Sequence, residues 1–331
     1  MSARVLITGG AGFLGLHLAK HLWKDGCDLC LVDNLIRGVD DPEFNQFLSN
    51  KRTTFIEADL LSIDQTISLG VDFDFIFHLA AIVGVRHVQD QPYNVLVKNT
   101  RMLENVITLA RMQKREPRLL FASTSEVYAG TLEHFGLTIP TSESAPLALT
   151  GLHFPRSSYM LSKLMGEAMV EQSGLPFTIF RPHNLYGSRM GNVHVIPEQL
   201  RKAYETDAGG SVVVYSPEHT RAFCFIDDSV EMLRRMMLRE GCSGRTLNLG
   251  SQTPEVTMRH VAEICIEVSG KELLIEELPP TPGSPPRRAP DMTLTNDLLD
   301  YQAAVGLRSG IEQTWEWYCS NVFESGGISA E

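Results

Sequence analysis

The first half of the chain alternates short apolar runs with longer segments in which apolar residues recur at helical spacing. The apolar runs, which predict β-strands, occupy residues 4–8, 28–33, 53–58, 73–78, 118–123 and 177–181. The segments that predict amphipathic helices lie between them, at 14–23, 94–113 and 157–172. Strands joined by helical crossovers form parallel sheets that are covered on both faces. We therefore expect an α/β fold with a doubly wound parallel sheet.

The pattern becomes less regular after Pro182. Helices are expected at 193–204, 227–239, 257–268 and 313–322, and strands at 212–215 and 246–249. The proline-rich stretch 279–290 predicts a loop or an extended crossing segment. We expect a first domain at 1–182, to which 222–250 returns, a smaller C-terminal α/β lobe that binds the substrate at 183–221 and 251–323, and a flexible tail at 324–331.

The composition is that of an ordinary globular protein, because 43% of the 331 residues are hydrophobic and 21% are charged. The chain has no long uninterrupted apolar run, so we expect no membrane span. Its first residues resemble a strand rather than a secretion signal, which favours the cytoplasm. The formal net charge of −11 argues against a nucleic-acid partner, since such proteins usually present a basic face.

Cys27 and Cys30 have the CxxC spacing that often indicates zinc binding or redox chemistry. No second pair accompanies them, and their neighbours predict a strand. Positions three apart on a strand point to opposite faces of the sheet. We therefore interpret both as core cysteines and expect no metal site.

Glycines follow the first predicted strand and precede the first predicted helix. Gly9, Gly12 and Gly15 belong to the run GGAGFLG, which also contains Phe13 and Leu14. Glycines at this junction let the backbone turn tightly and approach a pyrophosphate, while the helix N-terminus presents free N–H groups to it. The motif predicts a Rossmann-type sheet that binds a dinucleotide.

Asp33 ends the second predicted strand, where a carboxylate can accept hydrogen bonds from the ribose hydroxyls of NAD and would repel the additional phosphate of NADP. Arg37 lies close by and complicates this choice, but we favour NAD. Asp59 and Leu60 end the third strand and are candidates to hold the adenine.

Tyr159 and Lys163 are four residues apart on a predicted helix and therefore share a face. A neighbouring ammonium and a positively charged nicotinamide would lower the pKa of the phenol. The phenolate could then take a proton from a sugar hydroxyl while hydride leaves for NAD. Thr124 or Ser125, at the carboxyl end of the fifth strand, could bridge the reacting oxygen and Tyr159.

Taken together, these motifs resemble the extended short-chain dehydrogenase/reductase family, in its branch of nucleotide-sugar epimerases, dehydratases and decarboxylases. The matching segments are TGGAGFLG (8–15), VDN (32–34), ADL (58–60), HLAA (78–81), STSEVY (123–128), YMLSK (159–163), RPHNLYG (181–187), TRAFCFIDD (220–228), LNLGS (247–251) and RRAPD (287–291). They span nearly the whole chain.

The resemblance implies roles for individual residues. NAD would be held by Gly9, Gly12, Phe13, Leu14, Gly15, Asp33, Asn34, Asp59, Leu60, Leu79, Ala80, Ala81, Asn99, Ser123, Tyr159, Lys163, Pro182 and His183. The substrate, a nucleoside-diphosphate sugar and best a UDP-sugar, would be bound by Asn184, Val195, Arg221, Arg288 and Asp291. Family members often form homodimers through helices that correspond to 94–113 and 156–173.

Three reactions remain open after the common oxidation at C4 of the sugar: decarboxylation, 4-epimerisation and dehydration. Ser125 and Glu126 stand where 4,6-dehydratases of the family have Asp-Glu, and simple 4-epimerases have a small residue in place of Glu126. Ser-Glu-Val-Tyr is similar to the UDP-glucuronate decarboxylases, which favours decarboxylation, although Glu126 could also be a base at C5. His183 replaces a commoner aromatic or aliphatic residue and is either a contact to the sugar or a packed neutral side chain.

A different class of function also has to be considered, because some proteins with this fold bind a dinucleotide and act as sensors or scaffolds. Such proteins typically lack the tyrosine or the lysine. Both Tyr159 and Lys163 are present here, which favours an enzyme.

Overall fold

The computed structural model describes residues 2–280 and 284–324 and confirms the expected doubly wound parallel sheet. Seven strands form it in the spatial order β11-β6-β5-β4-β1-β2-β3, all parallel. Their bounds are β1 Arg4–Thr8, β2 Asp28–Asp33, β3 Thr53–Glu57, β4 Phe75–His78, β5 Arg118–Ala122, β6 Phe177–Pro182 and β11 Arg245–Leu249. The order reverses between β1 and β4, which is the switch point where such sheets bind ligands.

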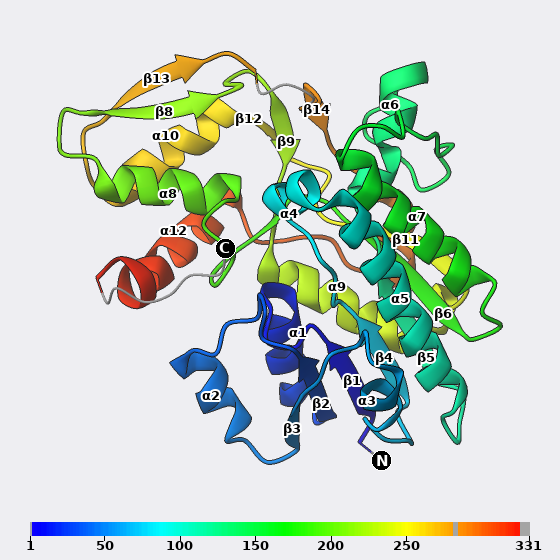
Figure 1. Ribbon diagram of the computed structural model, residues 1–331. Helices are drawn as coiled ribbons and strands as arrows, with labels where there is room; N and C mark the ends of the chain where they lie inside the picture. Colours follow the sequence, from blue (N-terminus) through cyan, green and yellow to red (C-terminus); the bar gives the residue numbers. More distant parts are fainter. Residues whose placement is uncertain (1, 281–283, 325–331) are drawn as a thin grey trace.

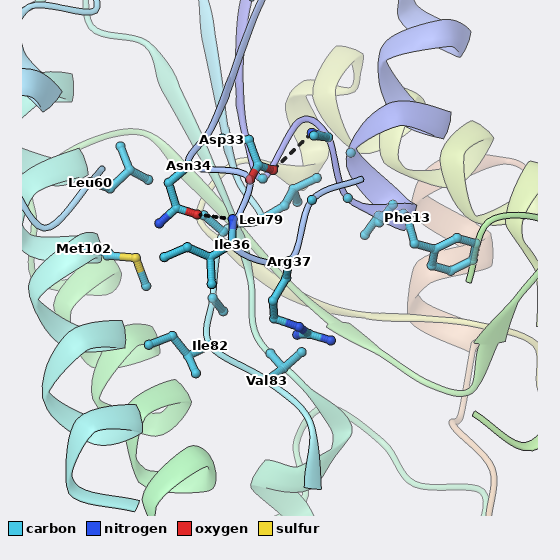
Figure 2. A pocket seen from close by; sticks show the side chains of 18 of the residues that line it. Phe13, Asp33, Asn34, Ile36, Arg37, Leu60, Leu79, Ile82, Val83 and Met102 are labelled. Carbon is cyan, nitrogen blue, oxygen red and sulfur yellow. Dashed lines mark hydrogen bonds between the residues drawn. The ribbon is translucent and has the colours of Figure 1, made fainter. Parts of the chain in front are cut away.

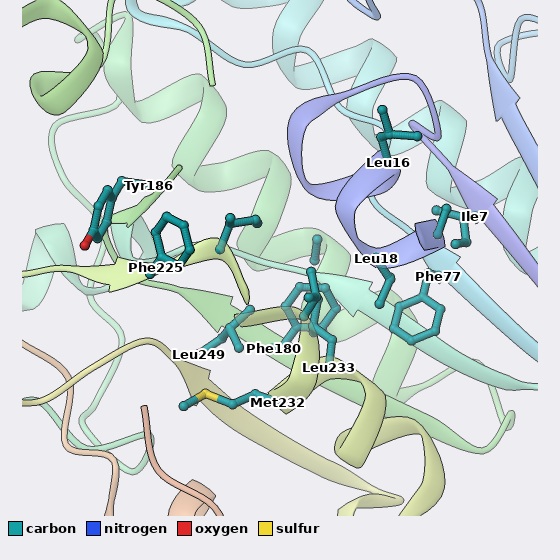
Figure 3. Packing of buried hydrophobic residues seen from close by; sticks show 14 of the residues in the cluster. Ile7, Leu16, Leu18, Phe77, Phe180, Tyr186, Phe225, Met232, Leu233 and Leu249 are labelled. Carbon is teal, nitrogen blue, oxygen red and sulfur yellow. The ribbon is translucent and has the colours of Figure 1, made fainter. Parts of the chain in front are cut away.

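Helices cover both faces of the sheet (Figure 1). On one face, α1 (Phe13–Lys24) and α9 (Ile226–Leu238) pack side by side, with α2 (Pro42–Leu48) beside β3. On the other face lie α3 (Ile63–Ile67), α5 (Pro92–Arg111) and α7 (Arg156–Glu171). Figure 3 shows the core of the first face, where Leu18, Phe77, Phe180 and Leu233 meet. Burial of these large side chains, at about 25 cal/mol per Å² of apolar surface, stabilises the layers that position the strand ends.

The two cysteines of the CxxC spacing pack on opposite faces of the sheet. Cys27 belongs to the core that contains α1, and Cys30 belongs to the core that contains α5. Both are buried and free. In the part of the chain that the structure describes, no group of three or more His, Cys, Asp or Glu side chains could hold a metal ion.

A smaller group of elements from the second half of the chain lies to one side of the sheet (Figure 1). Its helices are α8 (Val195–Glu205), α10 (Met258–Ser269) and α12 (Leu307–Tyr318), which continues as a π-helical turn at Cys319–Phe323. A further helix, α11 (Thr293–Leu299), contacts β11 and α9 of the sheet layer instead. Its strands are β8 (Ser211–Tyr215), β9 (Thr220–Ala222), β12 (Glu255–Thr257), β13 (Leu274–Leu278) and β14 (Arg287–Arg288). The residue boundaries of the two lobes stay a prediction.

Several short elements were not predicted, because strands of two to five residues and helices of one or two turns carry little periodic signal. They include the paired strands β7 (Leu185–Tyr186) and β10 (Cys224–Phe225), the strands β9, β12 and β13, the helices α2, α3, α4 (Val85–Asp90), α6 (Ala129–Phe135) and α11, and the 3-10 turns Ser125–Tyr128 and Glu240–Cys242. Within the proline-rich stretch, β14 pairs with β9 in parallel, so part of the expected crossing segment is a strand. Residues 325–331 of the expected tail at 324–331 lie outside the described residues. Among those described, no helix is long and apolar enough to cross a membrane.

Candidate active site

A cavity of about 500 Å³ lies at the carboxyl ends of β1, β2, β3 and β4. It brings together twelve of the residues that we expected to hold NAD, and Figure 2 shows several of them. These twelve are Gly9, Gly12, Phe13, Leu14, Gly15, Asp33, Asn34, Asp59, Leu60, Leu79, Ala80 and Ala81. They come from the ends of four strands that are adjacent in space, as the switch point requires.

At two glycines of the glycine-rich loop, a side chain would collide with neighbouring backbone atoms. A Cβ added at Gly15 would lie 2.1 Å from the carbonyl oxygen of Gly9, and one added at Gly9, whose φ is 72°, would lie 2.9 Å from the backbone nitrogen of Ala80. At Gly9 and Gly15, the loop and the first turn of α1 therefore form a narrow backbone cradle in which no side chain intervenes. This cradle fits the pyrophosphate of a dinucleotide.

Asp33 is fixed at the end of β2 by the backbone. One carboxylate oxygen of Asp33, which Figure 2 shows at the cavity, accepts a hydrogen bond from the N–H of Ala11 at 3.1 Å. The other oxygen accepts one from the N–H of Leu35 at 3.0 Å. Burial raises the pKa of Asp33, while these N–H groups oppose the increase. The side chain faces the cavity with both oxygens held, an arrangement that suits hydroxyl groups of a ribose.

The other expected cofactor residues do not line this cavity. Asn99 supports its wall from behind, because its amide accepts from the N–H of Ile82 at 2.7 Å and donates to the Ile82 carbonyl at 3.1 Å. Ser123 is buried against the carboxylate of Glu167. Four further expected residues lie beyond the cavity, at the ends of β5 and β6 and on α7: Tyr159, Lys163, Pro182 and His183.

The cavity also has walls that the motifs did not indicate. These residues come from the segment after β2, from the segment after β4, from α5, and from the segment before α8. They include Ile36, Arg37, Gly38, Val39, Ile82, Val83, Lys98, Met102, Arg189, Met190, Gly191 and His194. Of these, only Arg37 had attracted attention in the sequence, through its closeness to Asp33.

Tyr159 and Lys163 share the face of α7 that looks toward the end of β5. The Lys163 amine lies 5.9 Å from the centre of the Tyr159 ring and donates to the carbonyl of Ala122 at 2.7 Å. Burial raises the pKa of Tyr159 to about 12, although a side-chain hydrogen bond with Thr124 opposes this. Burial also lowers the pKa of Lys163 to about 7. Desolvation therefore dominates the pKa of Tyr159 in the protein alone, and the groups that oppose it are Thr124 and Arg37 rather than the expected Lys163.

Glu126 is held by two arginines from distant parts of the chain. Its carboxylate accepts from Nε of Arg156 at 2.9 Å and lies 2.9 Å from Nη2 of Arg288. Burial would raise the pKa of Glu126, but Arg288 and Arg156 outweigh it and keep the pKa below its usual value. Glu126 is thus an ion-paired carboxylate rather than one satisfied by local backbone, and it is poorly suited to act as a base.

Thr124 and Ser125 precede Glu126 at the carboxyl end of β5. Thr124 caps the 3-10 turn that follows by accepting a hydrogen bond from the N–H of Glu126 at 3.3 Å. Ser125 is buried in the first position of this turn. Of the two hydroxyls, Thr124 is the one that contacts Tyr159.

His183 is packed beneath the site. It is 1% exposed, and its Nε2 lies 3.1 Å from the side-chain oxygen of Asn248. The amide of Asn248 donates to the carbonyls of Thr141 and Asp291, so its oxygen is left to accept and His183 must donate. Burial lowers the pKa of His183 to about 3. The structure therefore favours the packed, neutral histidine.

The expected substrate residues are only partly brought together. Arg221 and Arg288 are paired neighbours in β9 and β14. Both terminal nitrogens of Arg221, however, donate to the protein: to the carbonyls of Thr220 and Pro286, and to Ser284 and Pro285. The terminal nitrogens of Arg221 are therefore already occupied by the protein, so this arginine does not offer an open fork to a diphosphate.

The remaining expected substrate residues lie around this region. The amide of Asn184 donates to the carbonyl of Ala222 at 3.0 Å. Asp291 accepts from the N–H of Thr293 at 2.9 Å. Val195 begins α8 and is 40% exposed.

The chain is similar to known proteins over nearly its whole length. The profile described as "NAD dependent epimerase/dehydratase family" matches residues 5–250. A UDP-N-acetyl-alpha-D-glucosaminuronate decarboxylase of Bacillus cytotoxicus is 30% identical, over 96% of this chain and 98% of that protein. UDP-glucuronic acid decarboxylase 6 of Arabidopsis thaliana is 30% identical, over 93% of this chain and 86% of that protein.

A solved structure shows the same fold. The epimerase Mth375 of Methanothermobacter thermautotrophicus superimposes with a TM-score of 0.82 at 25% identity, over 97% of this chain and 93% of that one.

Proposed function

The chain belongs to the NAD-dependent epimerase/dehydratase family, and we propose that within it this enzyme oxidises a UDP-uronic acid at C4 and releases its carboxyl group as CO2. Modification of a nucleotide sugar with NAD is the activity of the family members that the chain resembles. The proposal concerns which sugar is used and what happens to the C4 ketone.

One observation carries this proposal: Glu126 is clamped by Arg156 and Arg288, and Arg156 lies three residues before Tyr159 on α7. Two guanidinium groups and one carboxylate leave the cluster with one net positive charge. Glu126 and Arg288 are partly buried, while Arg156 is exposed, and the positive charge favours a second carboxylate beside the reacting centre. A uronic acid carries such a carboxylate at C6, whereas UDP-glucose does not. Decarboxylases of UDP-uronic acids are also among the relatives at 30% identity.

The residues around the cavity fit NAD, and we propose that the glycine cradle holds its pyrophosphate and Asp33 its ribose. When bound there, NAD takes up hydride from C4 of the sugar and can return it. Asn99 supports the wall of the cavity from behind, and Arg189 belongs to the wall and donates to the glycine-rich loop.

Tyr159 would accept the proton of the C4 hydroxyl, through or beside the hydroxyl of Thr124, and Lys163 would supply positive charge near the phenolate. The resulting C4 ketone is β to the C6 carboxylate, so the bond between C5 and C6 breaks, CO2 leaves, and its electron pair passes into an enolate at C4. Protonation at C5 would leave a pentose with a C4 ketone. This ketone would be converted to the alcohol by hydride from the reduced cofactor, when bound, and Tyr159 would return the proton to the C4 oxygen. Arg156 and Arg288 would orient the departing carboxylate.

Dehydration would require Glu126 to act as a base that removes the C5 proton. The low pKa that its two arginines impose argues against this role. 4-Epimerisation needs only Tyr159 and the cofactor, and it is therefore the competing outcome of the test. The test is incubation with NAD and, separately, UDP-glucuronate, UDP-N-acetylglucosaminuronate and UDP-glucose, read by mass spectrometry and NMR. Loss of CO2 from a uronate supports the proposal; an unchanged mass with a new sugar spectrum contradicts it and identifies an epimerase.

We also propose that two copies associate through α5 and α7, which pack along each other. Tyr93 and Val97 on α5 and Met165 on α7 are 75%, 41% and 46% exposed, so these helices present apolar side chains outward. All six cysteines are free, in keeping with a reducing compartment such as the cytoplasm.

A further inference from the structure

Arg189 connects three parts of the chain around the cofactor cavity. It lies in the segment between β7 and α8 and is 4% exposed. One terminal nitrogen donates to the carbonyls of Ala11 and Gly12 in the glycine-rich loop, at 2.8 and 3.4 Å. The other donates to the carbonyl of Val39 at 2.6 Å.

Asp41 completes this arrangement. Its Oδ2 accepts from Nε of Arg189 at 2.7 Å, while its Oδ1 accepts from the N–H of Phe44 and so caps α2. The guanidinium thus meets one carboxylate and three carbonyl oxygens, with every one of its nitrogens engaged. Charge-assisted hydrogen bonds of this kind are about twice as strong as neutral ones.

The backbone at Arg189 lies in the left-handed region, with a φ of 66°. A residue with a long side chain is uncommon there and adopts it only when its surroundings impose it. The contacts to the glycine-rich loop and to Asp41 are the ones that hold it. The strained turn brings Arg189, Met190, Gly191 and His194 against the cavity as the wall that belongs to the second lobe.

From this geometry we propose that Arg189 is a positioning residue that retains NAD. It fastens the 189–194 segment to the glycine-rich loop and to the segment after β2, so that a dinucleotide between them leaves only when this contact opens. NAD would then remain bound between turnovers, which suits a reaction that regenerates it. The inference rests on NAD binding and is independent of the fate of the sugar.

The experiment measures how quickly bound NAD exchanges, without substrate. Protein loaded with isotopically labelled NAD is mixed with excess unlabelled NAD, and the label that remains on the protein is followed by rapid gel filtration. Arg189→Gln should exchange at least about tenfold faster than the wild type, because it loses several charge-assisted hydrogen bonds. Arg189→Lys should be intermediate, since it keeps the charge but cannot contact all four oxygens.

Asp41→Asn separates the ion pair from helix stability, because asparagine also caps helices well. It should accelerate exchange although α2 keeps its cap. Arg118→Gln is the matched control: Arg118 is equally buried and donates to the carbonyls of Met236, Met237 and Arg239, but it begins β5 at the end of the sheet away from the cavity. It should lower the unfolding midpoint and leave exchange unchanged.

The proposal is overturned by one result: bound NAD leaves Arg189→Gln less than about fivefold faster than it leaves the wild type and Arg118→Gln. A wild type that exchanges NAD as quickly as the variants overturns it as well. If Arg189→Gln does not fold, Arg189→Lys and Asp41→Asn decide by the same comparison. A negative result in the sugar assay leaves this outcome untouched, because no sugar is present.

Discussion

A terminal nitrogen of Arg288 lies 2.9 Å from the carboxylate of Glu126, although Glu126 follows β5 of the central sheet and Arg288 belongs to β14 near the end of the chain. The pair therefore joins the Rossmann-type sheet to the second lobe at the place where Tyr159 lies. Without Arg288, the partly buried carboxylate of Glu126 would keep only the exposed Arg156 as its partner, and loss of one partner of such a pair is costly. The site is thus assembled only when both halves of the chain are folded together.

Replacement of Glu126 by glutamine should stop decarboxylation while sparing the first oxidation. The neutral amide no longer balances Arg156 and Arg288, so the geometry of the sugar carboxylate changes. We expect CO2 release to fall by about a hundredfold, the size of effect that a misplaced substrate causes, with NADH still formed on addition of the uronate. The absorbance of NADH and trapped CO2 measure the two steps. The exposed Glu133 provides the control, as Glu133→Gln, and unaltered CO2 release in Glu126→Gln would refute the assigned role.

Tyr159→Phe should abolish hydride transfer and leave NAD binding intact. The phenol oxygen is the proposed proton acceptor, and the ring does not line the cavity at the strand ends. Turnover is expected to decrease by about a hundredfold or more, with the NAD dissociation constant unchanged within error in calorimetry. Normal turnover in this variant would rule out Tyr159 as the base.

The sequence was informative where chemistry depends on neighbours along the chain. Tyr159 and Lys163 share a helix face at a fixed spacing, and the glycines stand between a strand and a helix, so both could be predicted. The pKa of Tyr159, however, could not be predicted. Burial, which a sequence does not show, raises this pKa, whereas Lys163 was expected to lower it.

Contacts between residues that are far apart along the chain could not be predicted from the sequence. Arg189 reaches Ala11 across 178 positions, and its partners are mostly backbone carbonyls, which every residue possesses. No pattern of residue types could therefore have indicated it. The two arginines that hold Glu126 likewise come from α7 and β14, and Arg156 carried no signal beside the more familiar tyrosine and lysine.

Gly15→Ala should remove NAD binding and destabilise the protein. The new methyl group would lie 2.1 Å from the Gly9 carbonyl and 2.9 Å from Cα of Gly10, so the loop has to open. Overpacking of this kind costs about 1–3 kcal/mol. Denaturant unfolding and NAD titration test both effects. The control is Gly174→Ala, since a Cβ there would meet no atom within 4 Å, although its φ of 78° adds strain; NAD binding should survive in that variant. Tight NAD binding by Gly15→Ala would contradict the cradle.

Charges on the outer faces of α5 and α7 should separate the proposed dimer. Val97→Glu combined with Met165→Glu places like charges on both copies, where apolar contact is expected, and the monomer should keep its fold because both side chains are already exposed. Light scattering after gel filtration gives the mass. A wild type that is monomeric at working concentration, or a double variant that stays dimeric, would exclude this interface.

The free energy of unfolding should fall as the pH decreases below the ordinary pKa of histidine. His183 should account for a measurable part of this decrease. Burial lowers the pKa of His183 to about 3, so between about 6.5 and 3 the unfolded chain binds a proton that the folded chain does not. The unfolded state then binds more protons, so the free energy of unfolding rises with pH and decreases as the solution is acidified. For one such histidine the loss between pH 7.5 and 5 is about 2 kcal/mol.

His183→Phe isolates this contribution, because phenylalanine fills the ring's place beside Tyr128 and cannot titrate. The variant loses the hydrogen bond to Asn248 at every pH, so its stability at pH 7.5 is the reference and only the change with pH is compared. His78, whose pKa burial also lowers to about 3, contributes equally to both proteins and cancels in the difference. Urea unfolding at the two pH values should show a loss smaller by about 2 kcal/mol in the variant. Equal losses would mean that His183 is charged in the folded protein at pH 5, and a charged imidazole there would need an anion beside it.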